Sequence, residues 1–150
     1  MEIRLATDQD RDAIHAILRS AGLPTADLDT ARPLFVVAHE GAALIGTAAL
    51  ERHGAAALVR SVAVVPEARN QGLGRALLEK LEAHARARGI RQLVLLTETA
   101  GPFFERAGYT ALDRTSAPPA VQVSAEFRSL CPASATCMSK VLDPSPAQSP

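Results

Sequence analysis

The chain has 150 residues, of which 47% are hydrophobic and 21% charged, and its formal net charge is zero. This composition is typical of a soluble globular protein, and the balanced charge argues against long-range attraction to nucleic acid or an anionic membrane. No apolar run approaches the roughly 20 residues that cross a bilayer, and Met1–Arg4 opens no signal peptide. We therefore predict a cytoplasmic protein without nucleic-acid or membrane partners, in which Cys131 and Cys137 are reduced thiols.

The length predicts one domain, which we place at residues 1–142. The remaining residues, 143–150, are rich in proline and polar side chains, so they are predicted to form a disordered tail.

The first third of the chain predicts a strand followed by a helix. Alternation over Glu2–Leu5 indicates a short, half-buried strand. Thr7–Asp10 resembles a capping box, and helical spacing of apolar residues over Ala13–Ala21 predicts a helix that ends at Gly22. Leu23–Arg32 is interpreted as a loop with one short helix around Ala26–Ala31.

The middle of the chain predicts three strands and a long helix. Leu34–Ala38 and Ala43–Leu50 form a hairpin around a turn at Glu40-Gly41, and Ala56–Val65 is the central strand. From Gly74 onward, apolar residues recur with helical spacing. Glu79, Lys80, Glu82 and Arg86 are expected to face solvent on this helix, with Glu82 and Arg86 forming an i,i+4 pair and Gly89 ending it.

The last third predicts shorter elements. In chain order they are a buried strand at Gln92–Thr97, a helix at Pro102–Ala107 ended by Gly108, a strand at Tyr109–Leu112, one or two helices in Pro118–Leu130 with Ser124 as a cap, and a strand at Ser134–Val141.

The stretch from Val62 to Arg75 predicts an anion-binding turn. An apolar strand ends at Pro66, and Arg-x-x-Gly-x-Gly over Arg69–Gly74 then opens the long helix. The first N–H groups of a helix have no carbonyl partner, so they attract phosphate together with the helix dipole. A P-loop would require Lys and then Ser or Thr after the second glycine, and a dinucleotide fingerprint would require a third glycine at Leu77. A plain connecting turn is the remaining alternative.

This turn resembles the pyrophosphate loop of the GNAT family of N-acetyltransferases, residue for residue over Arg69–Gly74. The resemblance covers roughly Met1–Asp113 and includes Phe103–Tyr109, which is similar to an aromatic helix of the family. It implies an α/β (α+β) fold with a mixed, mostly antiparallel central sheet flanked by helices.

The resemblance also implies that the chain uses acetyl-CoA as acetyl donor. The backbone of Val62 and Val64 would pair with the pantetheine arm, and a backbone N–H near Val62 would stabilise the oxyanion. The acetyl-CoA contacts that it implies are Val62, Ala63, Val64, Arg69, Asn70, Gln71, Gly72, Leu73, Gly74, Arg75 and Phe104. Phe104 stands where the family commonly has a tyrosine that protonates the leaving thiolate. Tyr109 is interpreted as a core aromatic.

Removal of a proton from the acceptor ammonium calls for a base. Glu51, at the end of the third strand, is the first candidate, although a solvated surface carboxylate fits the sequence equally well. His53 and Glu126 are weaker candidates. Arg60 is costly on a buried strand unless it is paired, and near the acceptor it would bind an acidic group of the substrate. Glu51 and Glu126 are also assigned to acceptor binding. Leu23–Arg32 is either a plain connection or, as the resemblance implies, one wall of the acceptor site. The histidines show no metal-ligand spacing, so no metal is expected.

The C-terminal stretch Ala125–Met138 resembles a pattern of the arsenic-resistance-associated N-acetyltransferases. Cys131 and Cys137 are either two buried apolar residues or ligands of an arsenical. The predicted function is acetyl-CoA-dependent acetylation of a small amine, with an amino-acid-like organoarsenical as one candidate. The alternatives are acetylation of a generic metabolite or protein amine, and a non-catalytic acyl-CoA-binding or arsenic-sensing module. Homodimers are common in the family, but the sequence identifies no interface.

Overall fold

The computed structural model describes residues 1–130 and 133–143. The chain divides into two compact units, residues 1–51 with 60–83 and residues 52–59 with 84–150. The assignment of 1–142 to one domain stays a prediction. Of the predicted tail, residues 144–150 lie outside the described part of the chain.

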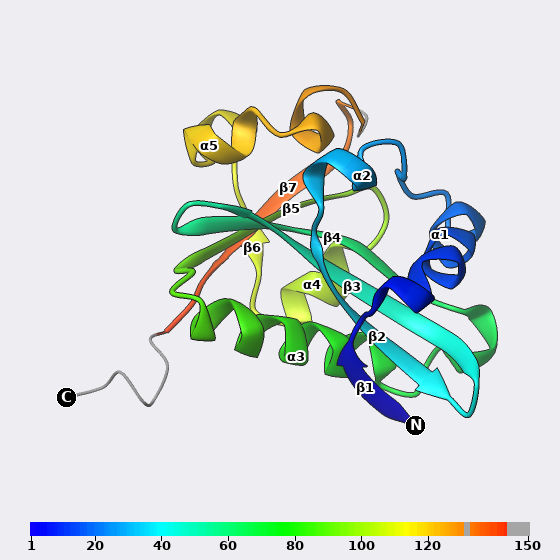
Figure 1. The fold of residues 1–150 in the computed structure, drawn as a ribbon. Helices are drawn as coiled ribbons and strands as arrows, with labels where there is room; N and C mark the ends of the chain where they lie inside the picture. The colour runs from blue at the N-terminus through cyan, green and yellow to red at the C-terminus, as the bar shows by residue number, and fades with distance from the viewer. Residues whose placement is uncertain (131–132, 144–150) are drawn as a thin grey trace. The chain divides into compact units, whose positions relative to one another are not determined.

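The strands form a mixed sheet with the order β1-β2-β3-β4-β5-β7-β6, and helices flank it (Figure 1). This arrangement confirms the predicted fold class. Every strand that the sequence predicted is present, with ends that differ by a few residues.

The first unit contains an antiparallel set of strands. β1 (Glu2–Leu5) pairs with β2 (Leu34–Glu40), and β2 pairs with β3 (Ala43–His53). The predicted hairpin is confirmed, and Gly41 in its turn has a φ of 60°. β3 runs to His53, three residues further than predicted, so Glu51 lies within the strand and does not end it.

The helices of this unit begin and end close to the predicted residues. A 3₁₀ helix at Asp8–Asp10 carries the predicted capping box and leads into α1 (Arg11–Ser20). The short helix predicted in the following loop is α2 (Leu28–Ala31). A core cluster of buried residues joins α1 and α2 to the sheet within this unit: Ile14, Leu18, Leu28, Val37 and Ala63.

The long helix α3 (Leu73–Ala87) buries one stripe, which includes Leu77, Leu78 and Leu81. The prediction that Glu82 faces solvent is wrong, since Glu82 is only 4% exposed. Glu82 follows Leu78 by four residues, so it lies on the same side of the helix as the buried stripe. The Glu82–Arg86 pair stays a prediction, and the ion pair described near the start of this helix joins Arg75 to Glu79 at 3.3 Å.

The second unit is built around β5 (Gln92–Thr97). Residues Ala56–Leu58 of β4 (Ala56–Val64) pair with it in parallel, and β7 (Thr136–Val141) pairs with it in antiparallel orientation. β6 (Thr110–Ala111) pairs with β7. The helices here are α4 (Gly101–Arg106), a 3₁₀ helix (Arg114–Ser116), α5 (Pro119–Gln122) and a π-helix (Glu126–Leu130). The predicted cap is confirmed, because the Phe127 N–H donates to the Ser124 hydroxyl at 3.3 Å.

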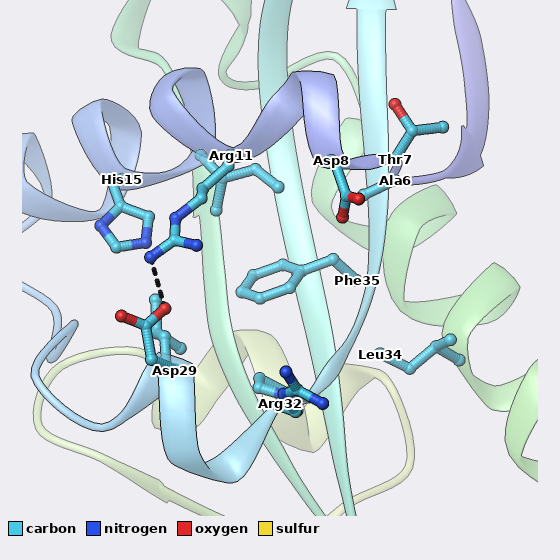
Figure 2. A pocket seen from close by; sticks show the side chains of 12 residues that line it. Ala6, Thr7, Asp8, Arg11, His15, Asp29, Arg32, Leu34 and Phe35 are labelled. Carbon is cyan, nitrogen blue, oxygen red and sulfur yellow. Dashed lines mark hydrogen bonds and ion pairs between the residues drawn. The ribbon is translucent and has the colours of Figure 1, made fainter.

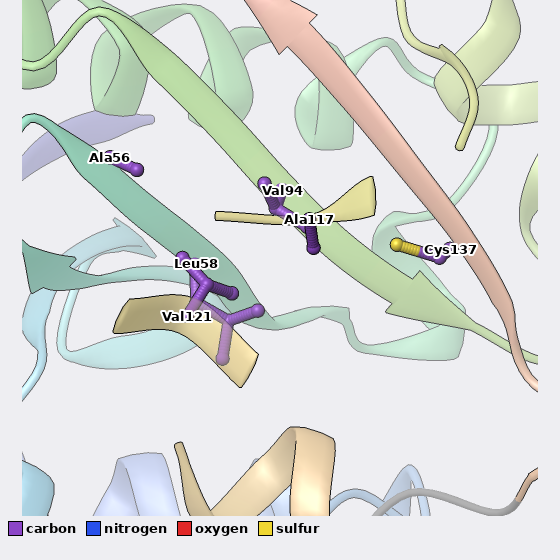
Figure 3. Packing of buried hydrophobic residues seen from close by; sticks show 6 residues of the cluster. All are labelled: Ala56, Leu58, Val94, Ala117, Val121 and Cys137. Carbon is purple, nitrogen blue, oxygen red and sulfur yellow. The ribbon is translucent and has the colours of Figure 1, made fainter. Parts of the chain in front are cut away.

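The core cluster of the second unit explains one of the two cysteines. Figure 3 shows Cys137 among the apolar side chains of the cluster, which also contains Ala56, Leu58, Val94, Ala117 and Val121. Cys137 is 4% exposed, and burial raises the pKa of its thiol above the usual value. The interpretation of Cys137 as a buried apolar residue is confirmed, whereas Cys131 lies outside the described residues.

Candidate active site

The end of β4 has an unusual backbone. Ser61 is buried and has a φ of 57°, in the left-handed region that a non-glycine residue rarely adopts. Its carbonyl accepts a buried hydrogen bond of 2.8 Å from the Thr47 hydroxyl on β3. A rare conformation persists where the surroundings hold it, and such positions cluster at functional sites. The Thr47 contact therefore fixes the backbone directly before Val62.

Alternation along the strand separates the side chains that follow. Ala63 packs into the core cluster with α1 and is 8% exposed. Successive strand residues point to opposite faces, so Val62 and Val64 are directed away from that cluster, and both are half-buried. These are the two residues whose backbone the sequence assigned to the pantetheine arm.

A tight turn connects this strand to α3. The Val65 N–H donates to the Ile45 carbonyl at 2.9 Å, and Pro66–Ala68 forms a 3₁₀ helix. Arg69 is exposed, but its Nε donates to the Val64 carbonyl at 3.0 Å. This bond joins the Arg69 guanidinium to the end of the strand and so fixes the Arg69 side chain beside the loop that follows.

The loop that follows contains two residues in the left-handed region. Asn70 and Gly72 have φ values of 65° and 76°. The first helical hydrogen bond joins the Ala76 N–H to the Gly72 carbonyl at 3.1 Å, so the N–H groups of residues 73–75 precede it. Such N–H groups at a helix start bind phosphate oxygens well. The loop is exposed at Asn70, Gln71 and Gly72, so an anion can reach it.

A cavity of about 320 Å³ adjoins this turn. It lies between the second half of α1 and the end of β4. Its walls include Ile17 and Ser20 on one side and Val64, Pro66 and Arg69 on the other. The Arg69 side chain thus lies both at the glycine loop and at the edge of this cavity.

A buried charge cluster lies deeper in the same unit. Arg60 on β4 has a side chain that is 0% exposed, and its Nη1 donates to Glu51 Oε1 at 2.8 Å. The same guanidinium makes two further bonds of 2.6 Å to the carboxylate of Asp27, just before α2. Arg60 therefore meets the condition that a buried arginine must be paired. The interpretation of Glu51 as a solvated surface carboxylate is wrong, because its side chain is 7% exposed.

Hydrogen bonding from Arg60 is the main reason that the pKa of Asp27 is lowered. The cluster contains one positive and two negative groups, so its formal charge is −1 when all three are ionised. A direct ion pair between Arg60 and an acidic substrate stays a prediction. The bonds to Asp27 and Glu51 favour a role that Arg60 exerts through those two carboxylates.

The other candidates lie on different elements. His53 is the last residue of β3 and is half-buried, while Glu126 is buried in the π-helix. Phe104 on α4 is 6% exposed and stacks edge-on against Phe103 and Tyr109, with ring centroids 5.0 and 5.6 Å apart. Tyr109 is 1% exposed, which confirms its interpretation as a core aromatic. Contact of Phe104 with acetyl-CoA stays a prediction.

A larger cavity, of about 600 Å³, lies between α1 and the α2–β2 connection (Figure 2). Phe35 and Leu28 supply apolar wall, while Arg32 and the ion-paired Arg11 and Asp29 supply charge. The cavity thus combines polar and apolar walls. Its wall includes α2, the segment that the sequence interpreted as either a connection or part of a substrate site.

Over residues 1–130 and 133–143, no group of His, Cys, Asp and Glu side chains is arranged to hold a metal ion. Within the same residues, no helix is long and apolar enough to cross a bilayer.

Comparison with known proteins identifies the family. The model of the acetyltransferase (GNAT) domain matches residues 31–111, which is more than half of the chain. The chain belongs to the GNAT family. The matched segment contains the β4 strand, the glycine loop and α3, so the resemblance predicted from Arg69–Gly74 is confirmed at the level of the family.

Relatives outside this model agree with the family. An uncharacterized N-acetyltransferase of Chlorobaculum tepidum is 38% identical over 84 residues, which are 55% of this chain and 53% of that protein. The chain thus spans about half the length of this curated relative. Mouse N-alpha-acetyltransferase 80 is 48% identical over 52 residues, or 35% of this chain and 17% of that protein.

Solved structures share the fold at lower identity. N-acetylglutamate synthase of Neisseria gonorrhoeae, complexed with coenzyme A and L-arginine, has a TM-score of 0.79 and 24% identity over 94% of this chain and 33% of that one. A Mycobacterium tuberculosis protein in complex with coenzyme A has a TM-score of 0.75 and 22% identity, covering 95% and 99% of the two chains. The arsenic-associated subfamily does not emerge from these matches.

Sequence reasoning missed two residues of the site. A buried arginine requires an acidic partner, but nothing along the chain singles out Asp27 from the other acidic residues. Thr47 likewise lies on an ordinary apolar strand. The contacts of Asp27 and Thr47 join segments that are distant in the chain, so no local sequence pattern indicates a role for these two residues.

Proposed function

We propose that this protein is an acetyl-CoA-dependent N-acetyltransferase that acts on a small amine. The observation that carries the proposal is the loop of residues 69–74, with its left-handed Asn70 and Gly72 at the start of α3. The helix N–H groups that precede the first intrahelical hydrogen bond, together with two flanking arginines, suit the pyrophosphate of acetyl-CoA.

The loop backbone leaves room for the pyrophosphate of acetyl-CoA. A Cβ added at Gly72 would meet no heavy atom within 4 Å, so the glycine is required by its φ and leaves open space beside the loop. Residues 73–75 offer N–H groups, and Arg69 and Arg75 bring positive charge. The extended backbone of Val62–Val64 would pair with the amide groups of the pantetheine arm.

The proposed reaction moves one acetyl group and one proton. The neutral amine attacks the thioester carbon, and the oxyanion that forms is stabilised by a backbone N–H near Val62, a contribution of about 3 kcal/mol to the barrier. The C–S bond then breaks and CoA leaves as the thiolate. The proton lost by the amine passes to Glu51, directly or through water, and solvent protonates the thiolate.

A second candidate function is binding of acyl-CoA without catalysis. Phe104 favours it, because it has no proton to donate at the position where the family commonly has tyrosine, and it is packed in the core of its unit. The reaction above does not require a protein acid for the thiolate. Phe104 therefore argues against a protein residue that protonates the CoA thiolate, and it argues less strongly against acetyl transfer itself.

For the acceptor, we propose an amine of amino-acid size. The cavity of about 600 Å³ beside α2 supports a small acceptor with charged and apolar parts. The resemblance of Ala125–Met138 to the arsenic-resistance-associated acetyltransferases supports an amino-arsenical as one member of this class. A protein N-terminus is the competing acceptor, supported by the similarity to mouse N-alpha-acetyltransferase 80. Cytoplasmic location and a homodimer stay predictions from the sequence.

Direct binding of As(III) by the two thiols has less support. The thiolate binds thiophilic metals and metalloids, and burial raises the pKa of Cys137, which disfavours the thiolate. The arsenic association is therefore better tested through the acceptor than through the cysteines.

Calorimetry with acetyl-CoA tests the cofactor assignment. In Gly74→Glu, a carboxylate and its bulk would face the pyrophosphate, so affinity should fall by at least about tenfold. Arg69→Ala should weaken binding less. Lys80→Ala, an exposed site further along α3, is the matched control and should bind as the parent does. Unchanged affinity in Gly74→Glu would contradict the cofactor assignment.

A thiol-release assay separates the enzyme from the binder. Acetyl-CoA is incubated with amino acids, aminophosphonates, amino-arsenicals and a short peptide with a free N-terminus. Release of CoA thiol that depends on one of these amines supports the enzyme and identifies the acceptor class. Tight acetyl-CoA binding without release for any amine supports the binding module.

A further inference from the structure

The buried guanidinium of Arg60 is shared between two carboxylates. Its Nη1 donates to Asp27 Oδ2 at 2.6 Å and to Glu51 Oε1 at 2.8 Å, while Nη2 donates to Asp27 Oδ1 at 2.6 Å. The side chains of Asp27 and Glu51 are 10% and 7% exposed, so water screens the three charges weakly.

The three residues come from three segments. Asp27 directly precedes α2, which forms part of the wall of the larger cavity. Glu51 lies on β3, and Arg60 directly precedes the left-handed Ser61, which in turn precedes Val62. The guanidinium thus connects a cavity wall, the candidate base and the backbone that leads to the candidate oxyanion donor.

We propose that Arg60 is a positioning residue for acetyl transfer, in which Asp27 holds the guanidinium with two bonds and Nη1 of that guanidinium holds the carboxylate of Glu51. This inference rests on the proposed function, because it assigns Arg60 and Asp27 a purpose only if Glu51 accepts the proton. Neither residue contacts the reacting atoms in this role.

Arg60 and Asp27 bring charges of opposite sign toward Glu51. Arg60 places a positive charge directly against the Glu51 carboxylate, and Asp27 places a negative charge against the same guanidinium. The charged groups near Glu51 include Arg60 on β4 and, beyond it, Asp27 before α2. Substitution of Arg60 removes the positive charge bonded to Glu51, whereas substitution of Asp27 removes the negative charge on the other side of the guanidinium.

A pH–rate profile tests this difference in sign. The value of kcat/KM is measured from pH 5 to 9 with acetyl-CoA and with the amine that releases CoA thiol fastest among the acceptors of the thiol-release assay (the panel amine). In Arg60→Gln, the acid limb should move to higher pH by about one unit or more, and in Asp27→Asn it should move to lower pH. Arg60→Lys retains the charge but not the planar fork, so its acid limb should stay near that of the parent while kcat falls.

Asp12→Asn on the exposed first turn of α1 is the control, since it makes the same chemical change outside the cluster. Its acid limb should match that of the parent. Thermal unfolding of each variant shows whether it is folded at the assay temperature, and if Arg60→Gln is not, the comparison of Asp27→Asn with Arg60→Lys carries the test.

The outcomes separate this inference from the proposed function. Opposite shifts in Arg60→Gln and Asp27→Asn support positioning by Arg60. An active parent with superimposable acid limbs in both folded variants overturns it and leaves a merely structural ion pair. A parent that releases no thiol with any amine overturns the proposed function, and the role of Arg60 with it.

Discussion

The loop of residues 69–74 and the cluster of Asp27, Glu51 and Arg60 lie in the same unit and use charge in opposite ways. The loop is exposed, is made of consecutive residues and presents its positive groups to solvent. The cluster is buried, is made of three separated segments and pairs one guanidinium with two carboxylates. An exposed site is ready for a ligand, whereas a buried one is suited to holding another group in place.

This difference implies different costs of substitution. The loop gains little stability from its charges, because exposed charges are screened by water. The cluster has removed three charges from water, so loss of one partner leaves the others uncompensated. Substitutions in the loop should therefore alter binding alone, and substitutions in the cluster should alter both stability and turnover.

The largest expected effect is on turnover in Glu51→Gln. If Glu51 removes the proton directly, kcat should fall by about 10²–10⁴-fold, with little change in acetyl-CoA affinity. The amide retains an oxygen that can accept the bond from Arg60, so the packing is preserved. Single-turnover kinetics with the panel amine and calorimetry with acetyl-CoA measure the two quantities. Turnover and pH profile equal to those of the parent would show that Glu51 is not the base.

The next largest effect is on stability in Arg60→Met. Two buried carboxylates would lose their cation, which should lower the free energy of unfolding by about 3–5 kcal/mol. Urea unfolding measures it, with Gly74→Glu in the loop as the comparison, which should unfold as the parent does. Equal stability of Arg60→Met and the parent would show that substitution in the buried cluster costs no more stability than substitution in the exposed loop.

A smaller effect is expected in the core of the second unit. Cys137→Ser places a hydroxyl among apolar side chains and should cost about 1–3 kcal/mol of unfolding free energy. Titration of the native protein with a thiol reagent should leave Cys137 unreactive, because it is buried and its pKa is raised. Rapid reaction of Cys137 in the folded protein would instead support the arsenical-binding alternative.

The smallest effect concerns Asp10, whose pKa is lowered from 3.8 to about 2, mainly by hydrogen bonds from Arg4 and then from the Thr7 N–H. Because the pKa of Asp10 is lowered in the folded protein, its ionised carboxylate stabilises the fold at any pH above the usual aspartate pKa. That stability is lost as the pH falls from about 4 through 2. Asp10→Asn should thus be less stable than the parent at pH 6 and similar to it at pH 2. A stability difference that is constant over this range would contradict the assignment.

The sequence by itself determined the order of the elements and the identity of the loop. Arg69, Gly72 and Gly74 lie within six residues of the chain. A glycine turn between an apolar strand and an amphipathic helix is a local pattern. The capping box at Thr7–Asp10 is local in the same sense. Such features depend on neighbours a few residues away, so the one-dimensional pattern is sufficient to predict them.

The tertiary structure decided which residues the site places together. Asp27 and Arg60 are 33 residues apart in the chain, and Arg60 selects Asp27 and Glu51 among many acidic residues because the β3–β4 pairing and the segment before α2 bring them within bonding distance. The burial of Glu82, which was expected to face solvent, and of Glu51, for which a surface position fitted the sequence equally well, was decided in the same way. Burial depends on what packs over a residue, and that depends on contacts between segments that a local pattern does not encode.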